Sequence, residues 1–137
     1  MIKSNKNYKP TVFFSLLIVG WIMGLFVESS QPSLPLLGAV EGLDKAAHFL
    51  AFGVLGLLVY GLSFTLTPKT AIPLFSMPLL IAILSGIIEE SYQMFVPGRT
   101  ASLLDLLADV CGAACAIVLA NCITFVIRVN KQTSAKR

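Results

Sequence analysis

The sequence predicts an all-α membrane protein, a four-helix bundle of four transmembrane helices with both termini in the cytoplasm. Three observations predict this class: four long stretches almost without charge, a composition too apolar for a soluble domain, and a lopsided distribution of lysine and arginine. The predicted transmembrane helices cover residues 11–27, 46–66, 71–93 and 103–127, within one membrane domain of residues 1–137.

The four charge-poor stretches have the length of a membrane crossing. Residues 11–27, 46–66 and 71–88 contain no Asp, Glu, Lys or Arg, and residues 103–127 contain only Asp105 and Asp109. At about 1.5 Å rise per residue, a helix of this length crosses a hydrocarbon layer roughly 30 Å thick. Stretches this long and this continuously apolar do not suit barrel strands, so helices are the expected form.

The overall composition also predicts a membrane protein, independently of where the apolar residues lie in the sequence. The chain is 56% hydrophobic and 12% charged, with a mean hydropathy of +0.85. A soluble domain of 137 residues has too small a core to hide so much apolar surface, so lipid must cover the remainder. The first stretch is expected to stay as an uncleaved span, because it exceeds a usual signal-peptide core and no clear cleavage site follows it.

The basic residues predict the orientation. Eight of the ten lysines and arginines lie in flanks that four crossings place on one side: Lys3, Lys6, Lys9, Lys69, Arg128, Lys131, Lys136 and Arg137. Only Lys45 and Arg99 fall on the other side, together with all seven acidic residues. Basic flanks mark the cytoplasmic side, so both termini are expected there. This distribution explains the basic pI, and no nucleic-acid partner is predicted.

Polar residues gather at the predicted outer ends of the second, third and fourth helices. They form pairs at helical spacing: Asp44 with His48, Glu90 with Gln93, and Asp105 with Asp109. Small residues continue the last two stripes deeper, Gly86 and Ala82 in one and Gly112 and Ala116 in the other. Small residues allow helices to approach closely and charged groups avoid lipid, so both stripes should face the bundle interior and each other. A polar pocket that opens outward is the predicted result.

Several of these residues also have ordinary interpretations. Asp44 and Lys45 suit a helix start at the interface, and His48 alone suits a satisfied polar residue. Glu89 can face the headgroups, and Ser102 with Asp105 three residues later forms a capping box. Asp109 and Glu90 resist such interpretations. Asp109 lies one turn beyond the capping position, and Glu90 ends an apolar run beside a second acid.

Two further patterns have modest weight. Gly20 and Gly24 form a GxxxG pair, which permits close packing inside the bundle or in a dimer. Cys111, Cys115 and Cys122 share one helix face without ligands at zinc-site spacing, and we interpret them as packing residues with no disulfide and no metal.

Three short motifs together resemble the VanZ-like family of small bacterial membrane proteins. They are Asp44-Lys45-Ala46-Ala47-His48-Phe49, then Glu90-Ser91-Tyr92-Gln93, then Pro97-Gly98-Arg99-Thr100-Ala101-Ser102 with Asp105. The resemblance covers roughly residues 43–120, with the first span as an addition. It implies the bacterial cytoplasmic membrane, a cell-envelope context and a link to glycopeptide resistance, without implying a known reaction. The family pattern leads us to expect Asn in many members where this chain has Asp109.

The polar residues support two hypotheses of different class. In the first, the protein acts on or binds a lipid-linked or phosphate-bearing envelope component. His48, Glu90, Asp105 and Asp109 are then the candidate catalytic residues, and Asp44, Lys45, Gln93 and Arg99 the candidate substrate-binding residues. In the second, the same residues form a non-catalytic network that locks helix ends or binds a partner. A transporter is a third option, although no inverted repeat is visible.

The expected ligands follow from these hypotheses. Membrane lipids are the expected partners, with a lipid-linked wall precursor or a glycopeptide as the specific candidates. No cofactor is predicted, but His48 with several carboxylates suits a divalent cation. Neither an HExxH motif nor a recognisable nucleophile motif occurs.

Overall fold

All regular structure in the described part of the chain is helical. The computed structural model describes residues 8–32, 40, 42–66 and 76–135, which form α1 (Lys9–Ser29), α3 (Leu43–Leu66), α4 (Ser76–Gln93) and α5 (Leu103–Ser134). The predicted all-α class is confirmed. The first five residues of the predicted third helix, 71–75, lie outside the described residues. So do five basic residues used for the orientation: Lys3, Lys6, Lys69, Lys136 and Arg137.

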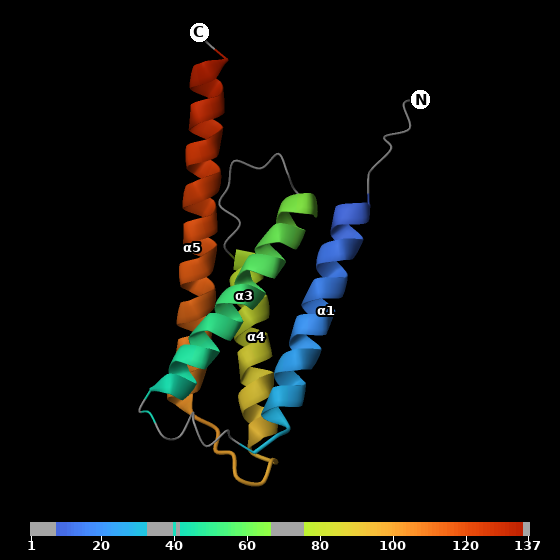
Figure 1. The fold of residues 1–137 in the computed structure, drawn as a ribbon, viewed down its shortest axis with the longest axis vertical. Helices are drawn as coiled ribbons and strands as arrows, with labels where there is room; N and C mark the ends of the chain where they lie inside the picture. The colour runs from blue at the N-terminus through green and yellow to red at the C-terminus, as the bar shows by residue number, and fades with distance from the viewer. Residues whose placement is uncertain (1–7, 33–39, 41, 67–75, 136–137) are drawn as a thin grey trace.

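Three of these helices, α1, α3 and α5, are long and apolar enough to cross a membrane. α4 is shorter at 18 residues and carries Glu89 and Glu90 near its end, so its composition alone does not mark it as a span. The first residues of α1 and the last residues of α5 lie at the same end of the molecule, and the first residues of α3 and α5 lie at the other end (Figure 1).

Helix boundaries differ from the predicted ones mainly at polar ends. α3 begins at Leu43, three residues before the predicted start, and therefore includes Asp44 and Lys45. α5 begins at Leu103 as predicted but continues to Ser134, seven residues past the predicted end. Hydropathy marks where a membrane ends, whereas a helix continues as long as its backbone hydrogen bonds do.

The core lies between α3, α4 and α5. Its fully buried members include Phe52, Leu55 and Val59 of α3 and Ile117 of α5. The most extensive helix pair is α3 with α5. At their crossing Gly112 lies against the backbone of Phe49, where any Cβ atom would collide with the Phe49 carbonyl group.

The two small-residue stripes meet different partners. Gly86 of α4 does face α5, since a Cβ atom there would lie 2.9 Å from Asp109 Oδ2. Gly112 instead faces α3, so the prediction that both stripes face each other holds for Gly86 and is wrong for Gly112. The reason is that α5 presents adjacent faces to two helices, and spacing along one helix does not say which neighbour receives which face.

α1 packs more loosely than the other helices. Ser29 is its only buried residue, and a Cβ atom at Gly20 or Gly24 would meet nothing within 4 Å. The GxxxG pair therefore makes no close packing with the described helices. Trp21 attaches the middle of α1 to α3, because its indole Nε1 donates a 3.0 Å hydrogen bond to the Ala51 carbonyl oxygen.

The exposure of the three cysteines differs from what we predicted. Cys111, Cys115 and Cys122 are all free and exposed on α5, whereas we interpreted them as buried packing residues. Cys115 lines an apolar cavity between α3 and α5.

Candidate functional site

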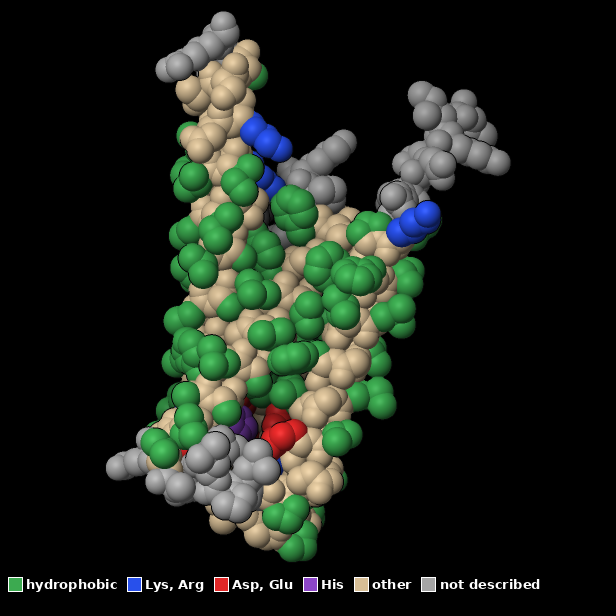
Figure 2. Space-filling view, in the orientation of Figure 1, with side chains coloured by type: hydrophobic (Ala, Val, Ile, Leu, Met, Phe, Trp, Pro, Cys, Tyr) green, Lys and Arg blue, Asp and Glu red, His purple; other side chains and the backbone are tan. Residues whose placement is uncertain are grey.

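Acidic and basic side chains from α3, α4 and α5 converge at the end of the molecule opposite the start of α1. Figure 2 shows acidic side chains and the histidine in a recess between α1 and α3, at the lower edge of the hydrophobic surface. We call this group the polar site; it comprises Asp44, Lys45, His48, Glu89, Glu90, Asp105 and Asp109.

His48 and Asp109 form the centre of the polar site. His48 Nδ1 lies 2.9 Å from Asp109 Oδ1, and Asp109 is completely buried while 12% of the His48 side chain is exposed. Asp109 is placed there because it follows Asp105 by one turn of α5 and because Gly86 of α4 leaves room beside its second oxygen. The arrangement fixes the imidazole ring against a carboxylate, as in many acid–base and metal sites.

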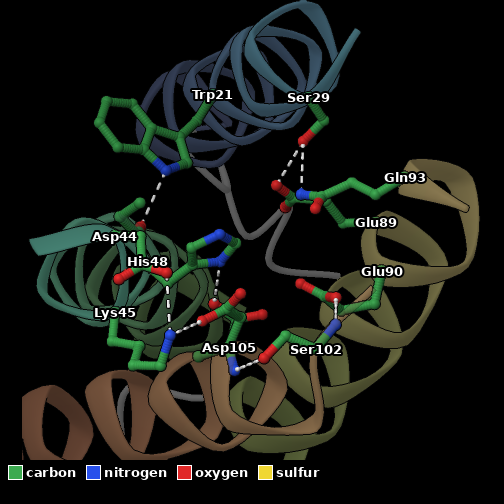
Figure 3. Close-up of polar contacts among 12 residues, drawn as sticks. Trp21, Ser29, Asp44, Lys45, His48, Glu89, Glu90, Gln93, Ser102 and Asp105 are labelled. Carbon is green, nitrogen blue, oxygen red and sulfur yellow. Dashed lines mark hydrogen bonds and ion pairs between the residues drawn. The ribbon is translucent and has the colours of Figure 1, made fainter. Parts of the chain in front are cut away.

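Glu90 contributes to the same centre and to the start of α5. Its Oε2 accepts a 2.7 Å hydrogen bond from the Ser102 backbone N–H, while the Ser102 hydroxyl accepts from the Asp105 N–H at 3.3 Å (Figure 3). A capping box would use the Asp105 carboxylate to accept from Ser102. Glu90 takes that role from another helix, which leaves the Asp105 carboxylate available elsewhere.

Lys45 joins α3 to α5 at the rim of the polar site. Its Nζ lies 2.8 Å from Asp44 Oδ2 and 3.1 Å from Asp105 Oδ1. The second contact is an ion pair without hydrogen-bond geometry, because Asp105 Oδ1 has no hydrogen-bond partner among the described residues. Lys45 therefore partly neutralises two carboxylates at the mouth, where about a third of its side chain is exposed.

Glu89 and Gln93 lie on the side of α4 that faces α1. The Ser29 hydroxyl donates to Glu89 Oε1 at 2.5 Å, and Gln93 Nε2 donates to Ser29 Oγ at 3.4 Å. All three residues are almost fully buried. Gln93, a predicted substrate-binding residue, thus contacts α1. Glu89 is buried and does not face the headgroups.

Arg99 fastens the turn after α4 to the end of α1. Its Nη2 donates to the Glu28 carboxylate at 2.6 Å and to the Glu28 carbonyl oxygen at 3.0 Å, and its Nε donates to the Gln31 carbonyl oxygen at 2.9 Å. Gly98 has a φ of +82°, a conformation that glycine adopts without steric cost, and it allows the turn to direct Arg99 toward α1. Arg99 is thus paired with Glu28, at the wall of the site.

The Arg99→Lys variant is expected to loosen this end of α1. Lysine keeps the charge but cannot supply the forked set of three hydrogen bonds, and bonds of a charged donor are worth about 1.5 to 3 kcal/mol each. Hydrogen–deuterium exchange at the Ser30 and Gln31 amides should become at least about tenfold faster. The matched variant Glu28→Gln keeps both carbonyl acceptors and should change exchange much less. Equal exchange in the wild type and Arg99→Lys would show that Arg99 does not hold α1.

A cavity of about 300 Å³ opens beside the polar site between α1 and α3. Its polar lining consists of Glu28, Asp44, His48, Glu89 and Arg99, and its apolar lining consists of Leu25, Ala47, Ala51 and Phe52. A second, apolar cavity of about 500 Å³ continues along the same two helices and shares Leu25 and Ala51 with the first. We call this second cavity the apolar groove. Leu16, Leu17, Gly20, Trp21 and Gly24 complete its lining.

The structure thus separates the predicted site residues into three groups. His48, Glu90 and Asp109 meet at the centre, while Asp44, Lys45 and Asp105 form the rim over α3 and α5. Gln93 and Arg99 contact α1. Glu28, Ser29 and Glu89 were not predicted as site residues. The sequence did contain a signal for Glu89, because it is adjacent to Glu90. Adjacent residues of a helix face different directions, so two adjacent acids must have two different partners.

Comparison with known families identifies the chain. The family model described as VanZ/LLP1 matches residues 2–125, a wider range than the predicted 43–120, and so includes the first helix. Comparison with curated proteins and with solved structures gives no match. The match spans nearly the whole chain together with the motifs that build the polar site, and the protein therefore belongs to the VanZ/LLP1 family.

Proposed function

We propose that this protein binds an envelope lipid whose headgroup bears phosphate, with the headgroup in the cavity beside the polar site and the hydrocarbon chain in the apolar groove. The observation that carries the proposal is the adjacency of the two cavities, which share the lining residues Leu25 and Ala51. A lipid has the same division into a polar end and a long apolar end. Specific ligand sites typically combine an apolar wall with a few convergent polar groups.

The proposal includes a topology. Four helices cross the bacterial cytoplasmic membrane, both termini lie in the cytoplasm, and the polar site opens at the outer face. The shared end of the α1 start and the α5 end supports an even number of crossings (Figure 1). With this orientation a lipid of the outer leaflet can enter sideways between α1 and α3, and the family's link to glycopeptide resistance suits a lipid-linked wall precursor.

The apolar groove can hold a hydrocarbon chain, because the residues that line it leave space. Gly20 and Gly24 line it, and neither has any atom within 4 Å of the position of a Cβ atom. Trp21 crosses the groove to Ala51 and satisfies its own N–H there, so it presents only its apolar ring to the groove.

A test measures lipid retention by native mass spectrometry on protein in nanodiscs. The probes are a polyprenyl phosphate, a lipid-linked wall precursor, a phospholipid and the uncharged polyprenol. The phosphate-bearing polyprenyl lipids should be retained and the polyprenol should be lost. Gly24→Leu, which fills the groove without a clash, should lower retention at least about tenfold, since a blocked pocket loses its buried apolar contacts.

The control variant Val19→Phe adds bulk to α1 at an exposed position outside the groove and should retain lipid as the wild type does. Equal retention by Gly24→Leu and wild type, or equal retention of polyprenol, would contradict the proposal. A dimer that Gly24→Leu dissociates would also contradict it, because the groove would then be a contact between two copies.

The His48–Asp109 pair favours a second candidate, acid–base chemistry on the same headgroup. A carboxylate bonded to one imidazole nitrogen orients the ring and leaves the other nitrogen available to transfer a proton. His48 also lines the cavity, whereas Asp109 does not. Mass spectrometry of the lipids recovered from the same incubations distinguishes the candidates, because only an enzyme converts the probe to a product of different mass.

A further inference from the structure

We infer that His48, Glu90 and Asp109 bind one divalent cation. These residues come from three helices, and each can offer one ligand atom such that all three atoms lie within 4.8 Å of one another. Small side-chain movements bring atoms at such separations onto a single ion, whose ligand bonds are about 2.0 to 2.2 Å long. The cluster is called the triad below.

Two carboxylate oxygens of the triad have no hydrogen-bond partner. Glu90 Oε1 and Asp109 Oδ2 are buried and unpartnered among the described residues, in side chains that belong to residues only 6% and 0% exposed. Buried oxygens of this kind are costly unless a proton, a water molecule or a cation receives them. Each residue's other oxygen is already engaged, with Ser102 N–H or with His48, so the free oxygens are the ones available as ligands.

Gly86 allows Asp109 to approach α4 closely. A methyl group at position 86 would lie 2.9 Å from Asp109 Oδ2 and 3.0 Å from Leu106 Cδ1. Gly86 thus lets the unpartnered oxygen of Asp109 lie close to α4, the helix that carries Glu90. Lys45 does not pair with this oxygen, because its Nζ pairs with Asp44 and Asp105 at the rim of the polar site.

The donor set indicates which class of cation fits. One imidazole nitrogen with two carboxylate oxygens suits first-row transition ions such as Mn²⁺ or Zn²⁺ better than Mg²⁺ or Ca²⁺, which prefer oxygen ligands alone. Three protein ligands leave further coordination positions for water or for a ligand oxygen.

The role of the ion rests on the proposed function, although its binding does not. Among the described residues of the cavity and the polar site, six carboxylates outnumber the two basic side chains, Lys45 and Arg99, each of which already pairs with one of them. A phosphate group would be repelled by this surplus of negative charge. A divalent cation on the triad would reverse the local sign and hold a phosphate oxygen directly.

The experiment titrates Mn²⁺ into the full chain in nanodiscs after removal of metals with EDTA. Electron paramagnetic resonance measures the free ion, and one tightly bound Mn²⁺ per chain is expected. Glu90→Gln, Asp109→Asn and His48→Gln each remove one ligand with little change in shape and should weaken binding about 10- to 100-fold. Asp44→Asn, on the rim but outside the triad, should change binding less than about threefold. Circular dichroism of every variant shows that the helices are retained.

Two results would overturn the inference: a wild-type chain that binds no Mn²⁺ or Zn²⁺ at millimolar concentration, or triad variants that bind as tightly as Asp44→Asn. Lipid retention measured with and without EDTA distinguishes this inference from the proposed function. Retention that persists in EDTA would remove the ion's role while the lipid site stands. Metal bound to the triad with no phosphate lipid retained would end the proposed function while the metal site stands.

Discussion

Replacing Gly112 with valine is expected to cost about 3 kcal/mol or more in the free energy of unfolding. Overpacking a core typically costs about 1 to 3 kcal/mol, and the cost is highest where the obstacle cannot move aside. At Gly112 the obstacle is backbone, since a Cβ atom would collide with the Phe49 carbonyl group and lie 2.9 Å from Phe49 Cα. The α3–α5 pair, the largest helix contact in the molecule, would have to separate. Unfolding in detergent by circular dichroism measures the loss.

The matched control is Gly20→Val on α1, where a Cβ atom meets nothing within 4 Å. It carries the same change in helix propensity and should destabilise the protein by less than about 1 kcal/mol. Similar destabilisation by both variants would show that α3 and α5 do not approach as closely as described. The smaller substitution Gly112→Ala adds the same Cβ atom and should also weaken metal and lipid binding. Phe49 follows His48, and Gly112 lies one turn after Asp109, so pushing Phe49 and Gly112 apart also lengthens the His48–Asp109 distance.

Hydropathy and helical spacing were sufficient to predict the helices and the centre of the site. The start of α5 at Leu103 follows from Ser102, whose side chain caps the helix as predicted. The convergence of His48, Glu90 and Asp109 follows from the cost of placing charged groups in lipid, which directs them inward whatever the details of packing. Such properties depend on one helix at a time, and a sequence displays them directly.

What could not be predicted depends on contacts between elements distant in the chain. Arg99 was predicted as a substrate-binding residue, and the sequence did not indicate that it bonds to Glu28 and Gln31, 71 and 68 residues earlier. Its partner depends on how a turn of irregular backbone folds, and no periodic pattern encodes that. Ser29 was overlooked for the same reason, because a lone serine at the end of an apolar helix gives no sign that two residues of α4 will bond to it.

The division of roles around Glu90 shows how a correct local prediction can miss its functional consequence. The capping box predicted from Ser102 and Asp105 explains Asp105 entirely within α5. In the structure only the serine half forms, and Glu90 of α4 supplies the other half. The bond from Ser102 to Glu90 leaves the Asp105 carboxylate available for Lys45 and fixes one oxygen of Glu90. The second oxygen of Glu90 has no hydrogen-bond partner among the described residues. The same hydrogen bond, from the Ser102 N–H to Glu90, thus both caps α5 and positions a residue of the polar site.

The double variant His48→Phe, Asp109→Leu is expected to be at least as stable as the wild type and to bind neither metal nor phosphate lipid. Removing one member of a buried ionic pair costs about 3 to 5 kcal/mol, because the other charge is left without a partner. Replacing both members by apolar residues is often neutral or stabilising by about 1 to 4 kcal/mol. His48→Phe alone should therefore destabilise the protein, since it leaves the fully buried Asp109 unpaired.

This comparison decides between a functional site and a structural network. A pair kept for binding should weaken the fold, so that the double variant recovers the stability lost in each single variant while Mn²⁺ titration and lipid retention stay at zero. A network whose purpose is to lock helix ends predicts the reverse, a double variant less stable than either single one. Chemical unfolding of the wild type, both single variants and the double variant in the same nanodiscs gives the coupling energy directly. If the losses in the free energy of unfolding at His48 and Asp109 simply add in the double variant, the hypothesis that the polar site exists to bind a ligand is rejected.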